Sequence, residues 1–123
     1  MKILIVDDNE VLASLIKEML DREGYYQVET AVNGEDGYDV FFDFKPDVIL
    51  TDIEMPVKNG IEMIRDIRMH HPEIKTIYMS SNLNRYRTLL EHDKTNYRSE
   101  MLDKPIHYPE IKRLFQECRR ELS

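Results

Sequence analysis

The chain has 123 residues, a length that fits one domain, and its 41% hydrophobic and 33% charged residues are typical of globular proteins. The net charge of −7 argues against direct nucleic-acid or anionic-membrane binding, because both need a basic surface. The single cysteine, Cys118, excludes an internal disulfide and a cysteine-based zinc cluster. The first apolar run is too short for a signal peptide, and no segment approaches membrane-spanning length. We therefore expect one cytoplasmic domain over residues 1–123.

Short apolar runs alternate with segments of helical spacing along the chain. The runs cover residues 3–6, 28–31, 48–50 and 77–79, with a weaker one near Met101 and Leu102. The segments between them carry apolar residues three or four positions apart, which is typical of amphipathic helices. This repeated alternation predicts an α/β domain with a parallel sheet covered by helices on both faces.

The first and last helical segments have clear apolar faces. The first, after "DDNE", is expected to bury Val11, Leu12, Leu15, Ile16, Met19 and Leu20. The last begins near Pro109, which suits a first helical turn because its missing N–H is not needed there. Its apolar face is expected to bury Ile111, Leu114, Phe115, Cys118 and Leu122.

Polar residues follow the predicted strands at the points where the strands end. They are Asp7 and Asp8, Asp52, Ser80 and Ser81, and Lys104 followed by Pro105. In a doubly wound parallel sheet, functional groups gather beyond the carboxyl ends of the strands. We therefore expect three carboxylates, a hydroxyl and an ammonium group to converge on one edge.

The carboxylates of Asp7, Asp8 and Asp52 would repel one another at close range. A divalent cation relieves this repulsion, and oxygen ligands without cysteine or histidine indicate Mg²⁺, with Mn²⁺ or Ca²⁺ as substitutes. Taken singly, an acid after a strand is often a helix cap, as Asp8 or Asn9 could be, and Ser80 alone could be a turn residue. Their joint placement favours a metal site.

Four segments contain these strand ends: "ILIVDDN", "PDVILTDIEMPVKNG", "IYMSS" and "LDKPI". They resemble the motifs of a response-regulator receiver domain of the single-domain, chemotaxis-regulator type. Each motif alone is weak, but together they occur in order and span nearly the whole chain. The resemblance implies a three-layer α/β/α fold with a five-stranded parallel sheet of order 2-1-3-4-5, the flavodoxin-like arrangement.

The resemblance also implies a phosphoacceptor and a metal site. Asp52 would be the aspartyl nucleophile that accepts a phosphoryl group. Mg²⁺ would be bound by Asp52, by Asp8 directly, by Asp7 largely through water, and by the backbone carbonyl of Glu54.

Three further residues have implied roles at this edge. Lys104 would pair with Asp52 and then with a phosphoryl oxygen, and Ser80 would donate its hydroxyl to another. Pro105 would hold the lysine loop through a cis Lys104–Pro105 peptide bond.

The implied activity is transfer of a phosphoryl group to Asp52 from the phosphohistidine of a sensor histidine kinase or phosphotransfer protein, or from a small phosphodonor. The domain would catalyse its own phosphorylation and dephosphorylation without being a conventional turnover enzyme. The output partner, or a second copy in a homodimer, would bind the face formed by the last strand and the last two helices.

The chain departs from the receiver pattern at three places. Met101 stands where receivers usually have a tyrosine or phenylalanine that switches rotamer with the strand-four hydroxyl, so the coupling could depend on packing alone. The segment 92–100, "HDKTNYRSE", is longer and more polar than usual. It could be a mobile loop before a poorly paired edge strand, or an altered output face. Glu54 adds negative charge close to the phosphoryl position.

Other functions explain the residues less well. A phosphorylation-independent pseudo-receiver would not need the set of aspartates, serine and lysine described above. A flavin-binding domain would need a polar, glycine-rich phosphate loop where the chain has the acidic "DDNE". A phosphatase with an Asp-x-Asp pair would carry that pair after its first strand, and Asp52-x-Glu54 is a poor copy.

Overall fold

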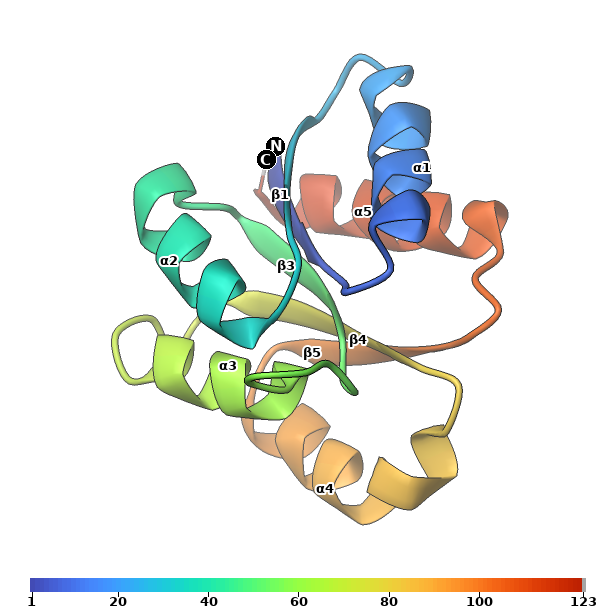
Figure 1. The fold of residues 1–123 in the computed structure, drawn as a ribbon. Helices are drawn as coiled ribbons and strands as arrows, with labels where there is room; N and C mark the ends of the chain where they lie inside the picture. Colours follow the sequence, from blue (N-terminus) through green and yellow to red (C-terminus); the bar gives the residue numbers. More distant parts are fainter. Residues whose placement is uncertain (123) are drawn as a thin grey trace.

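The computed structural model describes residues 1–122, which form five strands alternating with five helices (Figure 1). In chain order these are β1 (Lys2–Val6), α1 (Glu10–Asp21), β2 (Gln27–Ala31), α2 (Gly34–Phe44), β3 (Val48–Asp52), α3 (Gly60–Arg68), β4 (Lys75–Ser80), α4 (Leu83–Asn96), β5 (Ser99–Asp103) and α5 (Tyr108–Leu122). The sheet has the order β2-β1-β3-β4-β5 with all neighbours parallel, which confirms the predicted fold.

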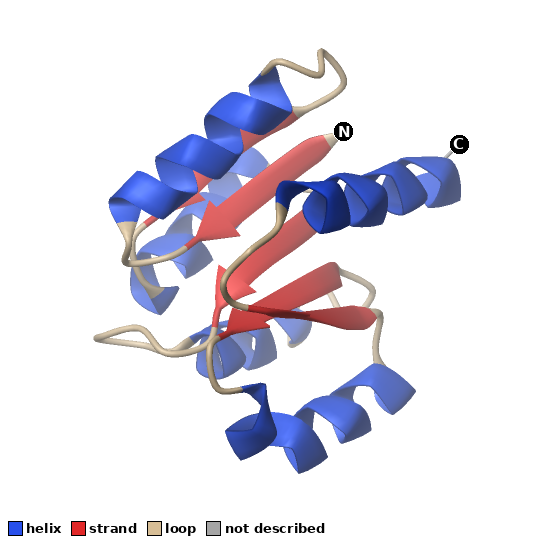
Figure 2. Cartoon of the chain, turned by 90° about the vertical axis from the view of Figure 1, so that its right-hand side faces the viewer, coloured by secondary structure: helices blue, strands red, loops and turns tan. Residues whose placement is uncertain are grey.

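Helices cover both faces of the sheet, with α1 and α5 on one side and α2, α3 and α4 on the other (Figures 1 and 2). Alternate strand residues divide between two cores, so that Ile3 and Ile5 pack towards α1 and α5 while Leu4 and Val6 pack towards the opposite layer. Burial on both faces explains why the strands read as continuous apolar runs.

Asparagine is the N-cap residue of three helices, and its side chain fixes where each preceding loop ends. Asn9 accepts a hydrogen bond from the Leu12 N–H at the start of α1, and Asn33 does the same for Asp36 in α2. Asn59 and Glu62 form a reciprocal capping box at the start of α3. The expected cap on the first helix is therefore Asn9 and not Asp8.

Three of the expected core residues lie on the surface. Val11 and Leu15 are 80% and 47% exposed, and Leu122 is 55% exposed. The sheet-facing side of α1 instead follows Ala13, Ile16 and Leu20, and a helix can bury only one stripe against a sheet. The exposed pair of α1 lies close to the carboxyl edge of β1, since the helix begins there.

The segment 92–100 is neither a loop nor followed by a poorly paired strand. Helix α4 continues to Asn96, and β5 pairs with β4 along its whole length, from Ser99 to Asp103. The reading as a mobile loop is therefore wrong. Arg68 of α3 forms a bidentate ion pair with Asp93 of α4, which orders this polar stretch by a contact made 25 residues away in sequence.

None of the helices within residues 1–122 combines the length and the apolar character needed to span a bilayer.

Candidate functional site

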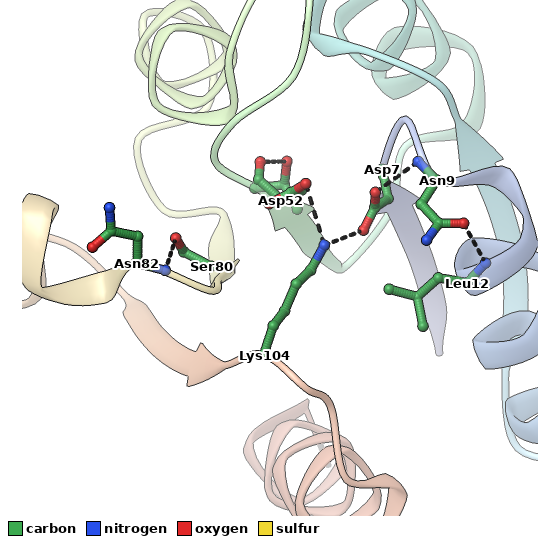
Figure 3. A network of polar contacts seen from close by, with 8 residues as sticks. Asp7, Asn9, Leu12, Asp52, Ser80, Asn82 and Lys104 are labelled. Atoms are coloured by element: carbon green, nitrogen blue, oxygen red, sulfur yellow. Dashed lines mark hydrogen bonds and ion pairs between the residues drawn. The ribbon is translucent and has the colours of Figure 1, made fainter.

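The carboxyl ends of the central strands bring the predicted site residues together. Asp7 directly follows β1 and Asp52 ends the neighbouring β3, and both are buried, at 1% and 8% exposure. Ser80 ends β4 on the other side of β3, and Lys104 follows β5 (Figure 3). The sheet order explains this meeting, because β1, β3, β4 and β5 are successive neighbours.

Lys104 bridges the two buried carboxylates. Its Nζ lies 3.0 Å from the Oδ2 of Asp7 and 3.3 Å from the Oδ2 of Asp52 (Figure 3). Its backbone N–H donates to the carbonyl of Ser80 at 3.0 Å, which ties the lysine loop to the end of β4. The Lys104–Pro105 peptide bond is cis, as the resemblance implied.

Burial and charge act in opposite directions on Asp52. Burial raises the pKa of its carboxyl, the nearby ammonium of Lys104 lowers it, and the carboxylate of Asp7 raises it, with a net increase. Burial lowers the pKa of Lys104, but the hydrogen bond and charge of Asp7, together with the charge of Asp52, outweigh this and raise it. Both shifts are consistent because Lys104 has two anionic partners, whereas Asp52 has one cationic partner and an anionic neighbour.

Three carboxylates at this edge can hold a cation together. One oxygen from each of Asp7, Asp8 and Asp52 lies within 4.8 Å of the other two. Asp8 is exposed, and the Oδ1 of Asp7 is oriented by the backbone N–H of Asn9 at 2.9 Å. Oxygen ligands that combine fixed and water-accessible carboxylates suit Mg²⁺, which retains several waters when bound. The residues therefore fit the expected metal.

Ser80 is buried and lies apart from the lysine-bridged pair (Figure 3). Its Oγ accepts a hydrogen bond from the N–H of Asn82 at 2.9 Å, which leaves its own proton available to donate. Ser81, next along the chain, is exposed. Asn82 is the N-cap residue of α4 but makes no side-chain capping bond, so the N-terminus of α4 lacks the hydrogen bond that holds those of α1, α2 and α3.

Glu54 and Met101 lie on the side of the site that faces α4. The Glu54 side chain is exposed, and burial raises the pKa of Tyr86 with a further contribution from Glu54. Met101 is partly buried against the core beneath α2, α3 and α4, and Leu83 and Tyr86 pack on the same core. Tyr86 was not singled out from the sequence, because its spacing in α4 marks it only as a core-facing residue.

The fold and site define a doubly wound α/β protein with an acidic, lysine-bridged cluster of side chains at the carboxyl edge of its sheet. The chain belongs to the response regulator receiver domain family, whose model matches residues 3–116.

Several named relatives are similar over part of the chain. Chemotaxis protein CheY of Thermotoga maritima is 34% identical over 80 residues, which are 65% of this chain and 67% of that protein. Protein CcdB of Bacillus subtilis is 38% identical over 62% of this chain and 63% of its own length. Transcriptional regulatory protein CpxR of Escherichia coli K12 is 42% identical over 68% of this chain but only 36% of its own length. The matched segment is thus between about a third and two thirds of these relatives.

Solved receiver structures share the fold over nearly the whole chain. Response regulator TrrA of Thermotoga maritima, solved in complex with Mg²⁺ and BeF, has a TM-score of 0.81 and 32% identity, and covers 95% of this chain and 97% of its own. The receiver domain of Francisella response regulator 1452 has a TM-score of 0.85 at 23% identity, and covers 99% of this chain and 98% of its own. The second likeness concerns the fold alone.

Proposed function

We propose that residues 1–123 form a receiver domain in which Asp52 accepts a phosphoryl group from a phosphohistidine of a sensor kinase or phosphotransfer protein. The observation that carries the proposal is the contact of Lys104 with both Asp7 and Asp52 beside the third carboxylate, Asp8. In the transfer, an Oδ of Asp52 attacks phosphorus while the P–N bond breaks and its electron pair returns to the imidazole nitrogen.

The residues around Asp52 would position and neutralise the phosphoryl group. Lys104 can turn from the carboxylate to a phosphoryl oxygen, since its ammonium already lies 3.3 Å from Asp52. Ser80 has a free hydroxyl proton for another oxygen. When bound by Asp7, Asp8, Asp52 and the Glu54 carbonyl, Mg²⁺, or Mn²⁺ or Ca²⁺ in its place, would supply positive charge at the phosphoryl oxygens. The same groups would assist attack of water on the acyl phosphate.

The exposed apolar pair of α1 is part of the proposed donor-docking surface. Val11 and Leu15 are exposed near the start of α1, which follows Asp7 and Asp8 directly. A protein that presents a phosphohistidine to Asp52 has to approach this edge, and exposed apolar side chains at its rim would add contact area. We place this exchange in the cytoplasm.

The proposed output is a change at the face formed by α4, β5 and α5, read by a partner or by a second copy of the chain. The start of α4 supports this proposal because it follows Ser80 closely and its Asn82 lacks a side-chain cap. Met101 and Tyr86 pack on the same core below α4, so the change would pass through their packing. Amide NMR spectra with beryllofluoride and Mg²⁺ should show shifts in α4 and β5; unchanged spectra there would contradict this output.

Incubation with acetyl phosphate and Mg²⁺ tests the central step. The expected result is a mass gain of one phosphoryl group, lost in Asp52→Ala and retained in Asp21→Ala, a surface aspartate on α1. Absence of any gain with acetyl phosphate and with a phosphorylated histidine donor would instead support the pseudo-receiver, a binding module that does not depend on phosphate.

A further inference from the structure

A cavity of about 210 Å³ lies between α3 and α4, away from the carboxylate site. The two helices neighbour each other at the end of the molecule opposite α1 (Figure 1). Pockets for drug-sized ligands usually measure about 300–1,000 Å³. This cavity is therefore of a size for a single side chain and not for a cofactor.

The floor of the cavity is held rigid by a buried ion pair. Arg68 donates to both carboxylate oxygens of Asp93, and the two side chains are only 8% and 16% exposed. The guanidinium of Arg68 also lies 3.9 Å from the centre of the Tyr97 ring. Its Nε is buried and finds no acceptor within residues 1–122. An unsatisfied buried donor carries a cost of about 1–3 kcal/mol. The charges of Arg68 and Asp93 balance each other, so the net positive charge of the lining comes from Arg65.

The rim of the cavity combines a cation with exposed apolar groups. Arg65 lines the cavity, is exposed, and has no ion pair among the described residues. Asp93, the acidic residue in the lining, already forms an ion pair with Arg68. Leu89 and Tyr97 also line the cavity and are 49% and 41% exposed, although large apolar side chains usually seek burial. A positive, apolar groove is thus present on a chain whose net charge is −7.

We propose that this groove, formed by the cavity and its rim at Arg65, Leu89 and Tyr97, binds a partner protein through an acidic side chain next to a large apolar one. The carboxylate pairs with Arg65, which is suited to planar, bidentate recognition of such groups. The apolar side chain enters the cavity and covers Leu89 and Tyr97. Charge complementarity selects this occupant, since a basic or purely apolar segment would leave Arg65 without a partner.

The groove would be an additional surface, distinct from the face proposed for the phosphorylation output. It uses the side of α4 that meets α3, whereas the output face includes β5 and α5. Both share α4, and its first residue, Leu83, lies three positions after Ser80. If phosphorylation shifts α4, it will change affinity at the groove, and by linkage a bound partner will change phosphorylation. Binding at the groove itself does not depend on the proposed phosphotransfer.

The test is selection of twelve-residue peptides displayed on phage (a length of about three helical turns) against the wild-type chain, followed by fluorescence anisotropy of the enriched peptides. The expected peptides contain Asp or Glu within one helical turn of Leu, Ile, Phe or Tyr. Arg65→Glu should weaken their binding about tenfold, because it replaces an attraction by a repulsion of similar size. Arg113→Glu makes the same charge change on α5, where Arg113 pairs with Glu117, and should leave binding nearly unchanged.

Three outcomes of the peptide experiment would overturn the proposal. They are an absence of enriched peptides, enriched peptides without the acidic and apolar pair, and binding that Arg65→Glu does not weaken more than Arg113→Glu. A fourth outcome, self-association of the wild type that Arg65→Glu abolishes, would overturn it too, since a second copy would then fill the groove. Circular dichroism spectra check that both variants are folded, and acetyl phosphate labelling of Arg65→Glu, expected to be unchanged, separates this result from the phosphotransfer proposal.

Discussion

Replacement of the Asp52 charge should stabilise the metal-free protein. Asp52→Asn keeps the size of the side chain and removes a carboxylate that is 8% exposed. Burial raises the pKa of Asp52, although Lys104 lowers it and Asp7 raises it. A raised carboxyl pKa means that the folded state prefers the neutral form, so the ionised form at neutral pH opposes folding.

The geometry gives the size of the effect. With an effective dielectric constant of about 20, the ammonium of Lys104 at 3.3 Å attracts Asp52 by about 5 kcal/mol, and Asp7 within 4.8 Å repels it by at least about 3.5 kcal/mol. Exposed Asp8, screened by water, adds repulsion of about 1 kcal/mol. Attraction and repulsion therefore nearly cancel, and the loss of hydration decides the sign. We expect Asp52→Asn to raise the free energy of unfolding by about 1–2 kcal/mol, because the variant no longer carries the desolvation penalty of a buried carboxylate and Lys104 keeps Asp7 as its partner.

Thermal melts followed by circular dichroism, in EDTA and in Mg²⁺, measure this difference. For a domain of this length the gain corresponds to a Tm increase of about 4–8 °C without metal. Mg²⁺ should raise the Tm of the wild type more than that of Asp52→Asn, since ligands stabilise the state that binds them. Asp21→Asn, on the surface of α1, serves as the control and should change neither value. A Tm of Asp52→Asn below that of the wild type in EDTA would refute the idea that the buried Asp52 charge opposes folding.

Two further substitutions probe the neighbours of Asp52. Lys104→Ala should reduce the free energy of unfolding by about 3–5 kcal/mol in urea titrations, because it leaves buried carboxylates unpaired. Lys112→Ala, which removes a more exposed pair, should cost less than about 1 kcal/mol, and equal losses would contradict this account. Gly60→Ala would place a methyl carbon in steric conflict with the carbonyl oxygen of Asp52, so it should cost about 1–3 kcal/mol and slow labelling by acetyl phosphate. Gly24→Ala is the control: its methyl group would meet no atom within 4 Å, so only the positive φ should lower the free energy of unfolding, by about 1–2 kcal/mol. Unchanged labelling of Gly60→Ala would contradict the prediction, because it would show that the end of β3 can shift freely.

The strand-end residues could be predicted because parallel strands impose a common edge. Once the apolar runs were read as strands, Asp7, Asp52, Ser80 and Lys104 had to lie at the carboxyl side of the sheet. The structure adds which of them touch: Lys104 contacts both buried aspartates, whereas Ser80 is hydrogen-bonded to the backbone of Asn82. Those distances depend on the conformation of the loops after the strands, which cannot be predicted from the sequence by strand periodicity alone.

Side-chain burial was predicted less well than element order. Val11 and Leu15 have the spacing of core residues, yet the sheet touches only the stripe of α1 that contains Ala13, Ile16 and Leu20. Hydrophobic periodicity shows that a helix has an apolar face but not how wide a stripe its neighbours cover. The exposed remainder of that face became part of the proposed docking surface.

By itself, the sequence determined the alternating order of strands and helices, and from it the edge at which the acidic residues meet, because local periodicity and strand direction are properties of the chain. Only the tertiary structure decided the form of the segment 92–100 and the groove beside it. Asp93 and Tyr97 are ordered by Arg68, which lies on another helix. An ion pair between two helices leaves no local pattern in the sequence. The polar end of α4 therefore could not be predicted as a packed helix, although its contact with Arg68 of α3 makes it one.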